Sequence, residues 1–301
     1  MIRTIWVLLA GAALTFVLSA TIWVLHAFGR LDVHDRCERL GRFWSRGVLR
    51  MSGVRVQLHA PDRAQWPHRA VIVANHQSWF DVFALAATLP VSYRFVAKEE
   101  LSRIPVFGTA WQACGHVSLP RKDRSRAIRS LKRASDQVRE GKSAIILFPE
   151  GTRSPDGRLR AFKKGAFVLA INNEVPVIPL GISGSRHVMP KGSFRIRPGE
   201  IRIRVGDPIP TADLEHRHRD ALLARTRAAV VSLMEDPDAL EQGGAPLPKP
   251  ASGPAPEPEL DGPERASDSS VPGGSTGGNR TPGGRESDNP ADHKEARENT
   301  A

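Results

Sequence analysis

His76 and Asp81 stand five residues apart in the stretch NHQSWFD. A carboxylate that accepts a hydrogen bond from one ring nitrogen of a histidine leaves the other nitrogen as a base near neutral pH. Such a base could take a proton from a hydroxyl group that a substrate brings, so no serine or cysteine nucleophile is required. Because five residues of a regular helix turn through about 500°, the two side chains can meet only if His76 lies outside the helix.

The same stretch also has a purely structural interpretation. Ser78 is a suitable N-cap for a helix, and Asp81 occupies the capping-box position three residues later. On that interpretation, Asp81 only caps the helix and His76 is a loop residue. The stretch by itself therefore leaves the role of Asp81 open, but in either case it predicts that the helix is capped by Ser78.

A second polar stretch, FPEGTRS at 148–154, combines groups that suit an anionic ligand. Pro149 cannot continue a strand and Gly151 frees the backbone, which predicts a tight loop. Arg153 fits phosphate oxygens with two parallel hydrogen bonds, Thr152 adds a hydroxyl donor, and Glu150 lies beside them. The alternative is a solvated basic loop. The spacing of a Walker A loop is absent.

The elements that would position these stretches are read from the hydrophobic pattern. Short β-like runs alternate with helical segments, which predicts an α/β domain with a largely parallel sheet flanked by helices. The runs are 54–58, 70–75, 93–98, 116–119, 143–148 and 176–182, and the helical segments are 83–89, 105–114, 124–141, 163–174 and 213–234. A hairpin is predicted for 193–197 and 200–206. Ligands of such sheets bind at the carboxyl ends of strands, so the two polar stretches are expected to meet there.

Residues 1–30 predict a membrane anchor helix. Residues 4–28 are apolar or small and carry no formal charge, which is enough to span a hydrocarbon core of about 30 Å. A cleaved signal peptide is the alternative, but the apolar stretch is long for one. One arginine precedes the stretch and six follow it within 30–50, so the positive-inside rule predicts a cell-membrane protein with its catalytic domain on the cytoplasmic side.

Residues 31–52 predict a basic amphipathic helix. Its apolar residues recur at three- and four-residue steps between arginines. They are Val33, Cys37, Leu40, Trp44, Val48 and Met51. This face could pack on the domain or lie on an anionic membrane surface. The position directly after an anchor favours the membrane surface.

Charge and composition distinguish the end of the chain from its body. Residues 241–301 lack aromatic residues and carry a net charge of −5, whereas residues 1–240 carry +16. The segment 237–301 is predicted to be a disordered tail, and the basic body favours an anionic partner. A single tyrosine argues against base stacking with nucleic acid. The cysteines, Cys37 and Cys114, are expected to be reduced in a cytosolic environment, and no metal-ligand spacing is present.

Taken together, NHQSWFD and FPEGTRS resemble the motifs of the glycerolipid acyltransferase family, most closely those of its lysophosphatidic acid acyltransferases. FVAKEEL and IPVFGTAWQACG at 95–115 and VPVIPLGI at 175–182 follow in the same order as in the family. The resemblance covers about residues 50–215, within a domain predicted at 53–236. It implies the family's α/β fold. It also favours a catalytic role for His76 and Asp81 over a role of Asp81 as a helix cap.

The resemblance also implies an activity and roles for residues. His76 would be the general base, oriented by Asp81, that activates the free hydroxyl of 1-acylglycerol-3-phosphate. An acyl group from acyl-CoA or acyl carrier protein would then give phosphatidic acid, with no cofactor and no acyl-enzyme. The residues that match substrate-binding motifs are Lys98, Arg121, Glu150, Gly151, Thr152 and Arg153.

One departure from the family leaves the acceptor open. Residues 118–121 read Ser-Leu-Pro-Arg where many relatives have Phe-Ile-Asp-Arg. Another lysolipid, such as a lyso-aminolipid or a different lysophospholipid, is therefore an alternative acceptor. A non-catalytic membrane protein that binds anionic lipid is the alternative of a different class.

Overall fold

The computed structural model describes residues 2–30, 32, 35–60, 66–120, 123–140 and 143–235. The predicted tail at 237–301 and the candidate residue Arg121 lie outside the described residues.

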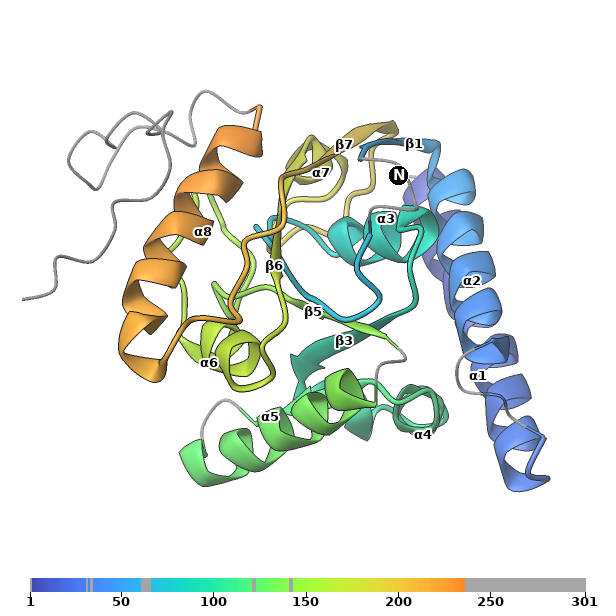
Figure 1. Cartoon of the computed structure of the whole chain (residues 1–301). Helices are drawn as coiled ribbons and strands as arrows, with labels where there is room; N and C mark the ends of the chain where they lie inside the picture. The colour runs from blue at the N-terminus through green and yellow to red at the C-terminus, as the bar shows by residue number, and fades with distance from the viewer. Residues whose placement is uncertain are drawn as a thin grey trace, which may run out of the picture. The chain divides into compact units, whose positions relative to one another are not determined.

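A seven-stranded sheet forms the centre of the described domain, with the strand order β1-β7-β6-β2-β5-β3-β4 (Figure 1). Every pair of neighbours is parallel except β6 and β7, which are antiparallel. The strands are β1 (Val54–His59), β2 (Val71–Ala74), β3 (Tyr93–Lys98), β4 (Val117–Leu119), β5 (Ala144–Leu147), β6 (Val177–Ser183) and β7 (Gly199–Val205). The predicted fold class, a largely parallel α/β sheet, is confirmed.

Helices cover both faces of this sheet (Figure 1). The α-helices are α1 (Ile2–Ala27), α2 (Arg36–Ser52), α3 (Phe80–Thr88), α4 (Phe107–Ala113), α5 (Arg124–Arg139), α6 (Gly165–Asn172), α7 (Ser185–Val188) and α8 (Arg219–Leu233). Within the described residues, short 3-10 helices are η2 (Glu99–Arg103) and η3 (His216–His218).

The central strands separate two hydrophobic cores. Ile72 and Ile146 face a core that includes residues of α1, α2 and α3. Val71 and Ile145 face the opposite core, which is closed by α5, α6 and α8. Because β2 and β5 are buried on both sides, they read as continuous apolar runs instead of alternating ones.

The predicted hairpin at 193–206 is wrong. Residues 193–198 form no strand, and β7 pairs antiparallel with β6 and parallel with β1. The N–H of Ile196 donates to Oγ1 of Thr4 at 3.2 Å, and the N–H of Arg197 donates to the carbonyl of Val188 at 2.9 Å. These donors are therefore engaged by α1 and by the end of α7, and Pro198 has none to offer.

The apolar face of α2 packs on the domain, which is one of the two predicted placements, and contact of this helix with a membrane surface stays a prediction. Val48 and Leu49 are buried. The ring of Trp44 meets the ring of Phe83 edge-on, with centroids 5.0 Å apart. Arg42 donates to the carbonyl of Val91 at 2.9 Å. The reason is that α3 and the following loop supply the apolar surface and carbonyl acceptors that α2 needs.

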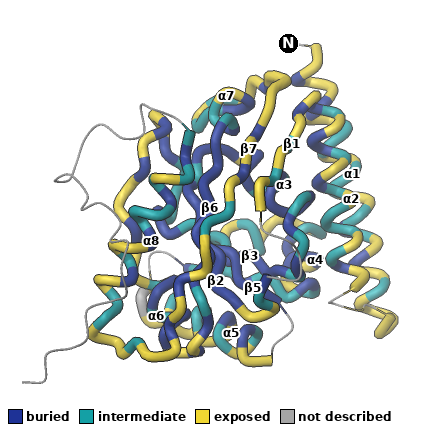
Figure 2. Tube along the Cα trace, turned by 45° about the horizontal axis from the view of Figure 1, so that its top comes forward, coloured by how far each residue is buried: buried dark blue, intermediate teal, exposed yellow. Residues whose placement is uncertain are grey.

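The helix α1 presents one side to the domain and leaves the other exposed. Val7 is buried, and Nε1 of Trp44 donates to Oγ1 of Thr15 at 2.9 Å. The exposed apolar residues of the helix include Ile5, Trp6, Leu9, Phe16, Val17 and Trp23. Figure 2 shows exposed stretches along α1. The helix has 26 residues and contains an 18-residue stretch with a mean hydropathy of 2.2, so it is long and apolar enough to cross a membrane. Its role as an anchor stays a prediction.

Cys37 and Cys114 form a disulfide, so the expectation of two reduced cysteines is wrong. The bond joins the first turn of α2 to the residue that ends α4, across 77 residues of sequence. The two Cα atoms lie 5.6 Å apart, which is a normal separation for a disulfide. Both α2 and α4 pack on α1, and this tertiary packing brings the two sulfur atoms together.

Candidate active site

His76 and Asp81 form a close pair at the carboxyl end of β2. Nδ1 of His76 lies 2.7 Å from Oδ2 of Asp81, and the Asp81 side chain is fully buried. An ionised carboxylate accepts a hydrogen bond here, so Nδ1 carries the proton and Nε2 keeps its lone pair. His76 is thus arranged to act as a base through Nε2.

The same carboxylate organises the turn before α3. Oδ2 of Asp81 also accepts the N–H groups of Gln77 and Ser78, at 2.7 and 2.8 Å. The helix α3 begins at Phe80, and Trp79 takes the N-cap position, one residue after the predicted Ser78. The Ser78 hydroxyl still accepts the N–H of Phe80 at 3.2 Å, and it donates to the carbonyl of Met189 at 2.8 Å. Asp81 therefore stabilises the turn and orients His76 at once.

Asn75 explains how β2 ends and the turn begins. Its Nδ2 donates to the carbonyl of Ile182 at 2.8 Å, and its Oδ1 accepts the N–H of Ile182 at 2.7 Å. The side-chain amide thus takes the place of one more backbone pair between β2 and β6. The backbone is then free to turn, and His76 leaves the sheet before the helix starts.

Glu150 joins the two polar stretches. Its Oε1 accepts the N–H of His76 at 2.7 Å, and its Oε2 accepts the N–H of Arg160 at 3.0 Å. The N–H of Ser154 also donates to the carbonyl of His76 at 2.7 Å. Glu150 is only 5% exposed, and burial raises its pKa to about 7 against the opposing effect of the two N–H donors. Glu150 therefore positions the His76 backbone and does not face the cavity.

The ring of Phe148 stacks on one face of the His76 imidazole. The two rings stack with centroids 4.1 Å apart and an interplanar angle of 17°. Gln77 reinforces the turn, since its Nε2 donates to the carbonyl of Gly157 at 2.9 Å. The orientation of the imidazole is thus set by a carboxylate on one nitrogen and by an aromatic ring on one face.

Arg153 supplies positive charge near His76. Its guanidinium lies over the ring of Trp79, 4.9 Å from the centroid, a cation–π arrangement. Burial lowers the pKa of Arg153, with Asp81 opposing that shift. Among the described residues, no carboxylate lies within ion-pair distance of Arg153. The cation is therefore held by an aromatic ring and is available to an anionic ligand.

The loop around Arg153 requires a glycine. Gly151 has φ +73°, and a Cβ atom there would come within 2.9 Å of the Lys163 side chain. Oγ1 of Thr152 accepts a long hydrogen bond, 3.4 Å, from Nζ of Lys191. Lys191 was missed by the sequence analysis, because it lies 39 residues from Thr152 in a segment with no motif.

A cavity of about 330 Å³ opens beside His76. The predicted residues Lys98, Gly151, Thr152 and Arg153 line it together with His76. Its remaining walls are largely apolar and come from α1, α2, α3, α4 and β3. Asp81 and Glu150 stand behind the cavity wall. Within the described ranges, no group of three or more His, Cys, Asp or Glu side chains is placed to hold a metal ion, and metal-independent action stays a prediction.

The fold and this site define the class of protein. Residues 55–183 match the model of the Acyltransferase family. The resemblance stated from the motifs is thereby confirmed.

Particular relatives refine this class. The chain is similar to the chloroplastic 1-acyl-sn-glycerol-3-phosphate acyltransferase BAT2 of Brassica napus, with 44% identity over 140 residues, or 46% of this chain and 40% of that protein. It is 34% identical over 166 residues to the 1-acyl-sn-glycerol-3-phosphate acyltransferase of Limnanthes alba, or 55% of this chain and 58% of the relative. The matches thus span about half the length of these relatives.

A solved structure covers more of the chain. The 1-acyl-sn-glycerophosphate (LPA) acyltransferase PlsC from Thermotoga maritima is 28% identical, with a TM-score of 0.55. The similarity covers 77% of this chain and 97% of that one. Both the sheet and most of its flanking helices therefore belong to a shared fold.

Proposed function

We propose that this chain transfers an acyl group from a thioester donor to the free hydroxyl of 1-acylglycerol-3-phosphate and so makes phosphatidic acid. The observation that carries the proposal is the His76–Asp81 pair, whose free Nε2 borders an apolar cavity that also holds Arg153. The names of the curated relatives and of the Thermotoga structure support the same acceptor.

The first step is proton removal and attack. Nε2 of His76 takes the proton of the acceptor hydroxyl, and Asp81 stabilises the resulting imidazolium. The acceptor oxygen forms a bond to the thioester carbonyl carbon, and the carbonyl oxygen becomes an oxyanion. Lys98 lines the cavity and supplies a positive charge for that oxyanion or for the phosphate.

The second step is collapse of the tetrahedral intermediate. The carbon–oxygen double bond re-forms, the carbon–sulfur bond breaks, and the thiolate leaves. The thiolate takes the proton from His76, which returns the imidazole to its starting state. Donor and acceptor thus exchange one acyl group and one proton, and no acyl-enzyme is needed.

Arg153, with Thr152 beside it, is placed to bind the acceptor phosphate. The guanidinium can make two parallel hydrogen bonds to phosphate oxygens. Its contact with the ring of Trp79 holds it in place beside the cavity. Glu150 is better assigned to positioning, because both of its oxygens accept backbone N–H groups. Arg121 keeps its predicted role in acceptor binding, although it lies outside the described residues.

We propose that α1 attaches the chain to a cell membrane, with the catalytic domain on the cytoplasmic side. The exposed apolar side of α1 and the arginines that follow it support this placement. Cytosolic reductants keep most accessible cysteines reduced. The Cys37–Cys114 bond is shielded from them, since the two residues are 6% and 5% exposed.

The test is acyl transfer from labelled acyl-CoA, and separately from acyl carrier protein, to lysophosphatidic acid in membranes. His76→Ala should lower the rate by roughly 10²–10⁴-fold, the usual contribution of a general base. His187→Ala is the matched control, because His187 is exposed on α7. Wild-type transfer that survives His76→Ala unchanged would overturn the assigned mechanism, and no transfer to any lysolipid from either donor would overturn the function.

A further inference from the structure

The cavity beside His76 extends along the strand β3. Lys98 at the carboxyl end of β3 and Tyr93 at its start both line the cavity. Their six-residue strand spans about 17 Å at roughly 3.3 Å per residue. Lys98 lies at the same edge of the parallel sheet as His76, so Tyr93 marks the far end of the cavity.

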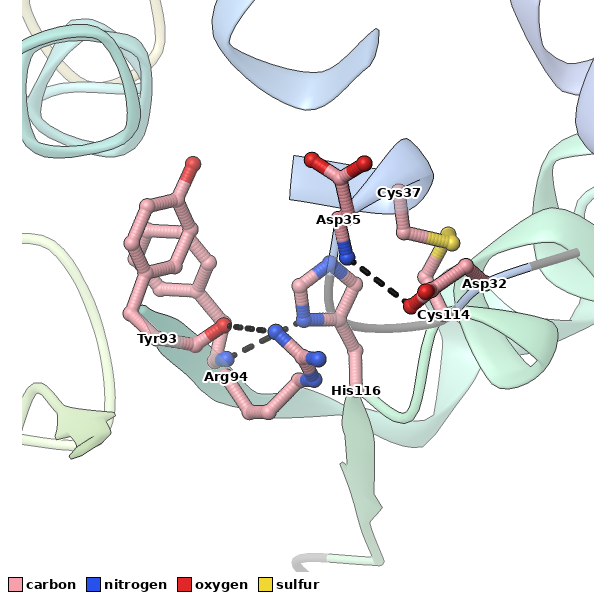
Figure 3. The surroundings of a disulfide bond; sticks show 8 residues. Asp32, Asp35, Cys37, Tyr93, Arg94, Cys114 and His116 are labelled. Atoms are coloured by element: carbon pink, nitrogen blue, oxygen red, sulfur yellow. Dashed lines mark hydrogen bonds between the residues drawn. A yellow bond between two sulfur atoms is a disulfide. The ribbon is translucent and has the colours of Figure 1, made fainter. Parts of the chain in front are cut away.

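The helix α2 follows the same path. Trp44 lies beside Phe83 of α3 and lines the cavity, while Cys37, seven residues earlier, lines it about two turns further along. Cys114 and Ile22 also line the cavity, and they pack with Cys37 in one buried cluster. Figure 3 shows Tyr93 and His116 in the surroundings of the disulfide. The Cys37–Cys114 bond therefore belongs to the far end of the cavity.

The helix α4 also lines the cavity, and it packs on α1. Val106, the residue before α4, has φ +65°, a strained conformation for a β-branched residue. The helix is seven residues long, too short to be stable without tertiary contacts. Its residues Ala110 and Trp111 line the cavity. The disulfide ties the carboxyl end of this helix to α2 and so limits how far the two walls can separate.

Two titratable residues that line the far end of the cavity, Tyr93 and His116, are neutral, and the buried guanidinium of Arg94 lies outside the described lining. Nδ1 of His116 accepts the N–H of Phe95 at 3.2 Å. Burial, with a smaller effect from Arg94, lowers the pKa of His116 to about 3, so its imidazole is neutral. Burial raises the pKa of Tyr93, whose hydroxyl donates to the carbonyl of Ala86 at 3.0 Å. A neutral, mostly apolar channel fits a hydrocarbon chain better than a headgroup.

We propose that the Cys37–Cys114 disulfide is a specificity determinant: by tying the carboxyl end of α4 to α2 at the far end of the cavity, it sets the longest hydrocarbon chain that the enzyme accepts. The proposal rests on the function proposed above. The chain belongs either to the acyl donor or to the lysolipid acceptor, and the two sources are distinguished by experiment.

The test measures kcat/KM for the purified full chain in lipid vesicles with saturated acyl-CoAs of increasing length and one lysophosphatidic acid. A second arm varies the chain of lysophosphatidic acid with one acyl-CoA. Oxidised wild type should show a sharp cut-off in one arm. Each methylene in an apolar pocket changes kcat/KM by about tenfold or more. Reduction should therefore raise the relative rate of chains just beyond the cut-off roughly tenfold.

The chain offers clean controls, since Cys37 and Cys114 are its two cysteines. Thiol titration reports directly whether the bond is open, and Cys37→Ser with Cys114→Ser removes the cross-link at nearly constant volume. The double variant should match the reduced wild type. Ile22→Phe fills the same end of the cavity with the bond intact, and it should move the cut-off to shorter chains.

Three outcomes would overturn the proposal. The first is two free thiols in the oxidised wild type. The second is an unchanged chain-length profile in active protein whose bond has been opened. The third, which does not depend on folding of the cysteine variants, is an unchanged cut-off in Ile22→Phe. Failure of the proposed function is distinct, because wild type would then give no product with any chain length.

Discussion

The N–H of His76 donates to Oε1 of Glu150 at 2.7 Å, although the two residues are 74 positions apart. A residue in the motif that resembles an acceptor-binding loop thus holds the backbone of the proposed base. The second oxygen of Glu150 holds the N–H of Arg160. The two motifs consequently form one rigid unit, and a change at Glu150 should disturb the base as well as the loop.

Glu150→Gln tests this link through the pH dependence of stability. The folded-state pKa of Glu150 is raised to about 7 from an ordinary value of 4.5. The folded chain therefore holds this proton more tightly than the unfolded chain, and the free energy of unfolding should fall as pH rises from about 4.5 to about 7. Denaturant melts across this range should show a shallower slope for Glu150→Gln.

The variant should also lose activity. A glutamine oxygen can accept one of the two N–H groups, but its amide nitrogen cannot accept the other. Glu140→Gln is the matched control, because Glu140 is exposed at the end of α5. If wild type and Glu150→Gln lost stability in parallel as pH rises, the raised pKa would not belong to Glu150.

Asp81→Asn should separate the orienting role of Asp81 from its role in the turn. The asparagine oxygen can still accept the N–H groups of Gln77 and Ser78, which Asp81 accepts at 2.7 and 2.8 Å. An amide cannot stabilise the imidazolium of His76 as a carboxylate does. We expect kcat to fall by roughly 10²–10⁴-fold, with a small change in KM and in the melting temperature. Steady-state kinetics and thermal melts of the same preparation measure both quantities.

The control for this prediction is Asp136→Asn, at an exposed position of α5. An Asp81→Asn protein that melts far below wild type would contradict the prediction and indicate that Asp81 acts mainly as a cap of the turn. Full activity in a stable Asp81→Asn protein would contradict the orienting role of Asp81.

Arg153→Ala should weaken binding of the phosphate monoester. Because Arg153 lies beside the cavity over Trp79, its loss should raise the acceptor KM about tenfold or more, as loss of a charge-assisted hydrogen bond of about 1.5–3 kcal/mol predicts. The donor KM should change little. A panel of lysophosphatidic acid and lysolipids with larger headgroups should show a reduced preference for the monoester.

Arg158→Ala is the matched control, since Arg158 is an exposed arginine of the same loop. Equal effects of Arg153→Ala on donor and acceptor KM would contradict the assignment. A wild-type enzyme that prefers another headgroup would support the alternative acceptor that the altered Ser-Leu-Pro-Arg motif leaves open.

Local patterns in the sequence determined most of the secondary structure and the two motifs. Apolar runs such as 70–75 and 143–148 are short-range signals, and the strands β2 and β5 lie within them. The five-residue spacing of His76 and Asp81 also acts locally, because both belong to one strand-to-helix turn. Such features depend on neighbours a few positions away, and a single sequence carries them directly.

Tertiary structure alone decided the features that join distant segments. The Cys37–Cys114 disulfide, the anchoring of His76 by Glu150 and the contact of Lys191 with Thr152 each link residues at least 39 positions apart. The predicted hairpin failed for the same reason, since α1 and α7 engage the backbone donors of Ile196 and Arg197. Periodicity shows which face of a helix is apolar, but the packing partner of that face, as for α2, is chosen by the assembled core.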